Sequence, residues 1–299
     1  MRPAHLCRSW LFVDGADEAA LLRVAPTSKA DVLIQELEDF TPPALRPKAR
    51  ALAPEVFRTW REAGYVVGVR VNPLDGDGMD DLAAVMRGAP HVVGLPKVAE
   101  PDHIVRLDLE ITRLERAYGL PEGSTAIWPN IELARGLVQT VAIARSSKRV
   151  GACLMASEDL AADLGAERGP DGVELAFSRQ RFLVDCVAAG VVAVDCPFTW
   201  RDDAGVERDT RWARRLGYKA KCTVAPGHAA IINAVLTPNA EEVARARKIV
   251  TTFEEARARG ESRVTVDGSM IEVPIYHNMR RLLARAEELA AAEGKPCNS

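Results

Sequence analysis

Charged and amide side chains lie in or just after most of the short apolar runs of this chain, which are typical of the strands of a parallel sheet. These residues are Glu36, Glu38, Asp39, Arg70, Asn72, Lys97, Glu132, Asp159, Asp195 and Lys221. Charges that only keep a protein soluble would instead be scattered over the outer faces of helices. Because the carboxyl ends of parallel strands meet at one rim, this arrangement predicts a reactive site there.

Two of the carboxylates, Glu132 and Asp159, have the chemistry of metal ligands. Hard oxygen donors suit Mg²⁺ or Mn²⁺, and Mg²⁺ takes few protein ligands, which leaves positions for water and substrate. A 2-oxo acid can chelate such an ion through its carboxylate and keto oxygens, and the ion then stabilises an enolate formed on carbon–carbon cleavage. A helix-cap aspartate and an exposed glutamate are the alternative interpretation of these two residues.

Arg70 lies inside an apolar run, where a charge needs a partner, and its planar fork suits a carboxylate or an enolate oxygen. We expect it to bind substrate, although an ion pair with a carboxylate of the preceding strand would also explain its position. Glu38 and Asp39 are expected to act with it in catalysis, by ordering metal-bound water or Arg70 itself. A purely structural pairing is the alternative for both carboxylates.

Lys97 and Lys221 raise a different possibility, because a desolvated lysine on a barrel strand is an amine nucleophile that can form a Schiff base. We expect Lys97 instead to support substrate binding electrostatically. Asn72 is assigned to substrate binding as well, and Pro73 holds its loop extended. His228 is interpreted either as a contact for substrate or coenzyme or as a surface histidine.

Eight short apolar runs that alternate with helix-like segments must position these residues. They lie near Trp10–Val13, Val32–Leu37, Val66–Val71, Val92–Pro96, Ala126–Ile131, Gly151–Met155, Val191–Asp195 and Lys219–Val224. This alternation predicts a (β/α)8 barrel over residues 1–236, which would be the catalytic domain, and a C-terminal helical extension or lid over residues 237–299. A doubly wound open sheet is the competing fold, but the first turn, Asp14-Gly15-Ala16-Asp17, lacks the expected glycine fingerprint.

Composition excludes several classes of protein. The 299 residues are 47% hydrophobic and 27% charged, and the net charge of -3 with a pI near 6.0 argues against a nucleic-acid partner. No apolar run is long enough to cross a membrane. The cysteines show no CxxC pairing, which predicts free thiols and a cytoplasmic protein. They are Cys7, Cys153, Cys186, Cys196, Cys222 and Cys297.

In this order the segments resemble the citrate lyase β-subunit-like group of the HpcH/HpaI aldolase family, which includes malyl-CoA and citramalyl-CoA lyases. The resemblance is carried by Arg8-Ser9-Trp10-Leu11-Phe12-Val13, Glu36-Leu37-Glu38-Asp39, Arg70-Val71-Asn72-Pro73, Leu95-Pro96-Lys97, Ile131-Glu132 and Asp159-Leu160. It implies Mg²⁺ (or Mn²⁺) on Glu132 and Asp159, substrate contact by Arg70, a coenzyme A thioester as a possible substrate, and a homotrimer or homohexamer.

Several positions depart from the family's motifs. Asp14 stands for a proline, Glu36 for an aspartate, Ala156 for a glycine, Ala225 for a histidine and Glu272 for an aspartate. In this family the first and last strand loops are where a coenzyme A thioester lies, and both are altered here. The metal ligands and the arginine are intact, so we expect retained enolate chemistry with a changed substrate.

Glu272 lies between Ile271 and Val273, where apolar neighbours would raise its pKa toward that of a general base. The resemblance implies that it acts in trans, as an acid or base at a methyl carbon in the barrel of a neighbouring subunit. A lid glutamate paired with Arg280 or Arg281 is the alternative.

The leading hypothesis is therefore a divalent-metal-dependent carbon–carbon lyase or aldolase. It would cleave or form a small 3-hydroxy acid, or its coenzyme A thioester, by way of a metal-bound 2-oxo acid and an enolate. A non-catalytic or accessory lyase-like subunit that binds a metabolite, and a Schiff-base lysine aldolase, are the alternatives.

Overall fold

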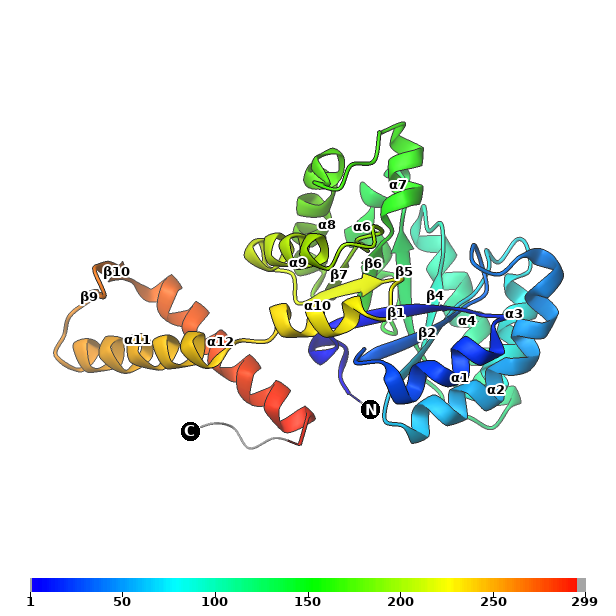
Figure 1. The fold of residues 1–299 in the computed structure, drawn as a ribbon, viewed down its shortest axis with the longest axis horizontal. Coiled ribbons are helices and arrows are strands. Elements are labelled where there is room, and N and C mark those ends of the chain that lie inside the picture. Colours follow the sequence, from blue (N-terminus) through cyan, green and yellow to red (C-terminus); the bar gives the residue numbers. More distant parts are fainter. Residues whose placement is uncertain (1, 295–299) are drawn as a thin grey trace. The chain divides into compact units, whose positions relative to one another are not determined.

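Eight parallel strands form a closed barrel in the computed structural model, which describes residues 2–294 (Figure 1). The strands are β1 (Ser9–Asp14), β2 (Val32–Glu36), β3 (Val66–Arg70), β4 (Val92–Leu95), β5 (Ala126–Ile131), β6 (Ala152–Met155), β7 (Val192–Asp195) and β8 (Ala220–Thr223). Each pairs with the next in sequence, and β1 also pairs with β8, which closes the sheet. The predicted (β/α)8 barrel is confirmed, and the open sheet is excluded.

Helices follow each strand and cover the outside of the barrel (Figure 1). They are α1 (Glu18–Thr27), α2 (Arg46–Glu62), α3 (Gly78–Val85), α4 (Pro101–Ala117), α5 (Ala134–Leu137), α6 (Thr140–Arg145), α7 (Ser157–Leu164), α8 (Ala176–Ala189), α9 (Asp203–Leu216) and α10 (His228–Leu236). Thr41 does not cap α2, although threonine followed by prolines is typical of a helix start. The Thr41 hydroxyl instead donates to the carbonyl oxygen of Glu36 at 2.6 Å, and a short 3-10 turn (Pro43–Leu45) precedes the helix.

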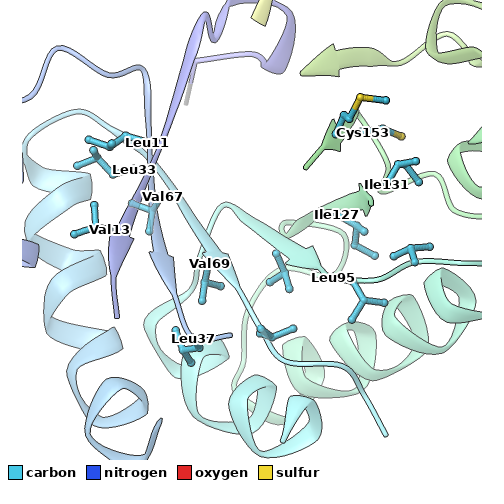
Figure 2. Close-up of a cluster of buried hydrophobic side chains, with 14 of the residues drawn as sticks. Leu11, Val13, Leu33, Leu37, Val67, Val69, Leu95, Ile127, Ile131 and Cys153 are labelled. Carbon is cyan, nitrogen blue, oxygen red and sulfur yellow. The ribbon is translucent and has the colours of Figure 1, made fainter. Parts of the chain in front are cut away.

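Alternating strand residues build two separate apolar layers. Residues such as Leu11, Leu33 and Val67 point outward and pack against the helices, as Figure 2 shows for β1 to β6. Their neighbours in sequence, such as Trp10, Val32 and Ile34, form the second layer inside the barrel, because side chains alternate between the faces of a strand. The same alternation carries inward-pointing side chains up to the carboxyl ends of the strands.

Two strand glycines make room for one tryptophan inside the barrel. A Cβ atom on Gly94 would lie 2.1 Å from the ring of Trp128, and one on Gly68 would lie 3.2 Å from it. Trp128 is fully buried, and its ring meets that of Trp10 edge to face. The aromatic filling of the barrel therefore depends on glycine in two neighbouring strands.

Thr237–Ser299 form a second compact unit, distinct from Met1–Leu236. Its described part comprises α11 (Ala240–Ala258), the hairpin strands β9 (Val264–Val266) and β10 (Ser269–Ile271), and α12 (Val273–Ala292). The helix over 240–258 begins with a capping box between Asn239 and Glu242. The last helix begins at Val273, and Pro274 is accommodated in its first turn.

The five cysteines within the described residues, Cys7, Cys153, Cys186, Cys196 and Cys222, are buried free thiols. Cys297 lies outside the described residues. Among residues 2–294, no helix has the length and apolarity that a membrane crossing requires.

Candidate active site

A cavity of about 610 Å³ lies at the carboxyl ends of the barrel strands. Its polar lining includes Asp39, Arg70, Asn130, Ser157, Glu158, Asp159 and Thr199. Its apolar lining includes Phe12, Phe40, Leu154, Ala156, Ala162, Pro197, Cys222 and Val224. The cavity thus has a small charged region at one end and a broad apolar wall. This lining suits a ligand that has one acidic end.

Arg70 is held by the acidic loop that follows β2. Its Nε donates to Glu36 Oε1 at 2.8 Å, and its Nη2 lies 3.3 Å from Glu38 Oε2 and 3.9 Å from Asp39 Oδ2. Burial lowers the pKa of Arg70, but the surrounding carboxylates outweigh this effect and raise it. Arg70 therefore has the ion-pair partners of the structural interpretation and also borders the cavity, so the two interpretations are compatible.

Glu132 is fully buried, and two neighbours hold its carboxylate in one orientation. One of its oxygens accepts from the backbone N–H of Lys97, and the other accepts from the Asn130 amide at 3.3 Å. The orientation of that amide is set in turn by Trp128, whose Nε1 donates to Asn130 Oδ1 at 2.8 Å. Burial raises the pKa of Glu132 to about 7; Arg70 opposes this shift, and the negative charge of Asp159 adds to it.

Asp159 lies in the first turn of α7 and borders the cavity. Its charge is close enough to Glu132 to raise the pKa of that carboxyl, and a divalent cation would remove this repulsion. Among the described residues no group of three or more His, Cys, Asp or Glu side chains could hold a metal ion. A pair of carboxylates fits Mg²⁺ or Mn²⁺, which bind few protein oxygens and keep water and substrate as further ligands.

The two candidate lysine nucleophiles are both ion-paired. Lys97 Nζ pairs with Glu38 and lies 3.6 Å from Asp39 Oδ1. The φ angle of Lys97, 52°, is left-handed, so its N–H can reach Glu132 while its side chain reaches the acidic loop. Burial lowers the Lys97 pKa, but the hydrogen bond and charge of Glu38 raise it overall. A protonated lysine is a poor nucleophile.

Lys221 lies on the outer side of the barrel, away from the cavity. Its Nζ is 2.7 Å from Asp195 Oδ2 and 2.6 Å from Asp209 Oδ2, and Arg179 bonds the same two carboxylates. Asp195 and Asp209 raise the pKa of Lys221 although its burial lowers it. These groups form a buried network between β7, β8 and their helices.

Asn72 does not line the cavity among the described residues, contrary to its assignment to substrate binding. Its amide donates to Leu37 O and to Asp81 Oδ2, each at 2.8 Å, and so ties together the loops after β2 and β3. His228 is buried at the start of α10, so its interpretation as a surface histidine is wrong. Its Nε2 lies 3.7 Å from Asp203 Oδ1.

Glu272 stands at the N-cap of α12, in the second unit. Its side chain is 57% exposed within that unit, so the expected apolar surround is absent among the described residues there. The arginine near it is Arg263, at 4.0 Å, rather than Arg280 or Arg281.

Sequence reasoning missed four residues of the site: Phe12, Phe40, Trp128 and Asn130. Phe12, Trp128 and Asn130 occupy inward positions of their strands, so strict period-two counting from the strand ends would have found them. The glycines at 68 and 94 were a further signal for Trp128, since glycine inside a strand marks a close approach. Phe40 stands in a loop and gives no such signal.

Comparisons with known proteins identify relatives of this chain. A family model described as HpcH/HpaI aldolase/citrate lyase matches residues 8–226. The chain is 32% identical to citrate lyase subunit beta of Leuconostoc mesenteroides subsp. cremoris over 98% of each protein. It is 30% identical to a (3S)-malyl-CoA thioesterase of Cereibacter sphaeroides, over 96% of this chain and 97% of the relative. A solved citrate lyase beta subunit from M. tuberculosis, complexed with oxaloacetate and magnesium, is 25% identical, with a TM-score of 0.62 over 78% of this chain and 99% of that one.

Proposed function

Because the chain belongs to the HpcH/HpaI aldolase/citrate lyase family, as its motifs indicated, we propose that it cleaves or forms a carbon–carbon bond of a small 3-hydroxy acid or of its coenzyme A thioester. A 2-oxo acid is the fragment that the charged end of the cavity binds. The observation that carries this proposal is the convergence of Arg70 and Asp159 on one cavity, with buried Glu132 beside them.

Glu132 and Asp159 are the residues that would hold Mg²⁺ or Mn²⁺. When bound, the ion supplies Lewis-acid polarisation of the substrate's oxygens. The hydrogen bonds from Lys97 and Asn130 keep the Glu132 carboxylate in one orientation before any ligand arrives. The relatives named citrate lyase subunit beta, and the solved one complexed with oxaloacetate and magnesium, support this assignment.

The chain's other residues bind the acid end and manage the protons. Arg70 pairs with the substrate carboxylate, while Glu38, Asp39 and Lys97 hold Arg70 and nearby water in place. On cleavage the 3-hydroxyl loses its proton and becomes a carbonyl. The electron pair of the broken carbon–carbon bond passes to the other fragment, which is then protonated at carbon. The apolar wall of the cavity excludes competing water.

The expected activity can be tested directly with the purified protein. With Mg²⁺ and a 3-hydroxyacyl thioester such as malyl-CoA, a 2-oxo acid should be released, as measured by trapping it with phenylhydrazine. EDTA should lower the rate to background, at least about 100-fold, and added Mg²⁺ or Mn²⁺ should restore it, because the ion stabilises charge in the transition state.

Three outcomes would contradict this proposal, each in favour of a different function. Full activity after EDTA, together with substrate trapped on a lysine by borohydride, would indicate a Schiff-base aldolase. Release of free thiol without any 2-oxo acid would indicate thioester hydrolysis, the activity that the Cereibacter sphaeroides relative is named for. Binding of the 2-oxo acid without turnover of any thioester would indicate an accessory subunit.

Glu272 is proposed to act in trans, as the acid or base at the methyl carbon of the enolate fragment in a neighbouring subunit. Support comes from its exposure within its own unit, which leaves the carboxylate available to another surface. Inactive Glu272→Gln and inactive Asp159→Ala subunits should regain activity when mixed, approaching about a quarter of the wild-type rate after random exchange of neighbours. A fully active Glu272→Gln enzyme would remove this residue from the mechanism.

A further inference from the structure

Glu36 is the last residue of β2 and lies beside Arg70, the last residue of β3, in the register of the sheet. It points into the barrel, above Val32 and Ile34 of the inner layer, because strand side chains alternate. Its side chain is fully buried. A carboxylate in such a place needs several strong partners, and Glu36 has them.

The two carboxylate oxygens of Glu36 divide their partners between the arginine and the acidic loop. Oε1 accepts from Arg70 Nε at 2.8 Å and from the backbone N–H of Glu38 at 2.7 Å. Oε2 accepts from the backbone N–H of Phe40 at 2.6 Å. The Glu36 side chain thus connects the Arg70 guanidinium to the loop that carries Glu38 and Asp39, whose carboxylates lie near that guanidinium.

This connection restricts the orientation of the Arg70 guanidinium. Its Nε is taken by Glu36, and its Nη2 lies beside Glu38. Its central carbon lies 5.1 Å from the centre of the Phe12 ring and 5.8 Å from that of the Phe40 ring. Because the Phe40 backbone is itself bonded to Glu36, both the hydrogen bond and one of the ring contacts depend on this glutamate.

We propose that Glu36 is a positioning residue for substrate binding, which holds the Arg70 guanidinium in the orientation that receives the acid group of the substrate. The inference rests on the proposed function, in which Arg70 binds that acid group. Glu36 does not border the cavity among the described residues and acts only through Arg70 and the loop. Its carboxylate also neutralises Arg70 from the Nε side, which leaves Nη1 and the second hydrogen of Nη2 for a bidentate contact.

The test is Glu36→Gln, which keeps the length of the side chain but has only one accepting oxygen. It cannot accept from both the Arg70 Nε–H and the Phe40 N–H, so either the guanidinium or the Phe40 part of the loop loses its hydrogen bond. We expect KM for the substrate, and the Kd for pyruvate measured by calorimetry with Mg²⁺, to rise about tenfold, with a smaller change in kcat. In an Arg70→Lys background the same substitution should change KM by less than threefold, because its effect passes through the guanidinium.

Gln35→Met is the matched control, since Gln35 precedes Glu36 but points outward and bonds Gly15 O and Ala49 O. It should lower Tm and leave KM unchanged. A Glu36→Gln enzyme with a lowered Tm and an unchanged KM would overturn the inference. A double variant in which the effects of Glu36→Gln and Arg70→Lys on KM simply add would overturn it as well.

Two further results keep the outcomes distinct. If Glu36→Gln does not fold, Phe40→Leu is the second test. Loss of the ring contact between this half-exposed loop residue and Arg70 should raise KM about threefold, and an unchanged KM would overturn the inference. If Arg70→Lys alone leaves KM and kcat/KM unchanged, the proposed substrate role of Arg70 fails, whatever Glu36 does. A damaged Arg70→Lys enzyme beside an unaffected Glu36→Gln enzyme would refute only the positioning role.

Discussion

Replacing Asp159 by asparagine should lower Mg²⁺-dependent lyase activity by about 1,000-fold and abolish measurable Mn²⁺ binding. Asparagine keeps the size of the side chain but removes the charge that, with Glu132, is proposed to hold the ion. Transition-state stabilisation by a bound ion amounts to several kcal/mol, and ~4 kcal/mol corresponds to roughly 1,000-fold in rate. The measurements are kcat/KM against Mg²⁺ concentration and Mn²⁺ affinity by electron paramagnetic resonance.

The stability of the Asp159→Asn protein should separate loss of the ion from loss of the fold. Burial is the main cause of the raised Glu132 pKa, and repulsion by Asp159 adds to it; an acid in the first turn of α7 nevertheless favours the helix. These effects oppose one another, so Tm in EDTA should move by no more than about 2–4 °C. Glu158→Gln is the matched control, because Glu158 stands in the same turn but bonds Thr199 and Arg168. Glu158→Gln should change Mn²⁺ affinity less than threefold. If Asp159→Asn also changes Mn²⁺ affinity less than threefold, Asp159 is excluded as a ligand.

The barrel could be predicted from the sequence because each of its strands is a short apolar run of parallel-sheet type. All eight strands lie within one or two residues of the predicted runs. Helix faces were harder to predict: Glu115 is a charged residue of α4, yet it is fully buried. It bonds Arg149 at 2.7 Å and the backbone of Gly123 and Thr125, a set of partners that comes from distant loops.

A site residue could be predicted only where a charged side chain also stands at the carboxyl end of a predicted strand. Arg70, Glu38, Asp39, Lys97, Glu132 and Asp159 all lie around the carboxyl ends of the strands, as their positions after apolar runs indicated. Asp195 ends β7 and Lys221 lies in β8, yet both point outward into a buried network, because their strand parity differs from that of Val194 and Cys222. Hydrogen-bond partners in loops, such as those of Asn72, cannot be read from spacing alone.

Replacing Arg70 by lysine should lower kcat/KM by roughly 30–150-fold, which corresponds to about 2–3 kcal/mol of transition-state stabilisation. Lysine keeps the positive charge that Glu36 and Glu38 require, so the barrel should still fold. It has no planar fork to form two parallel hydrogen bonds with a carboxylate, and no flat face to lie over Phe12 and Phe40. Steady-state kinetics with the released 2-oxo acid as readout give the change in kcat/KM.

Arg135→Lys is the control, because Arg135 is exposed and pairs with Glu100. Such a surface pair contributes little, so this change should alter kcat/KM by less than twofold. An Arg70→Lys enzyme that is equally unaffected would make Arg70 a structural ion-pair partner alone. That result would have a wider consequence: among the described residues that border the cavity, Arg70 is the only one with a positive charge. An acid group on the substrate would then depend on the metal ion alone, and its affinity should fall to zero in EDTA in both the wild-type and the lysine enzyme.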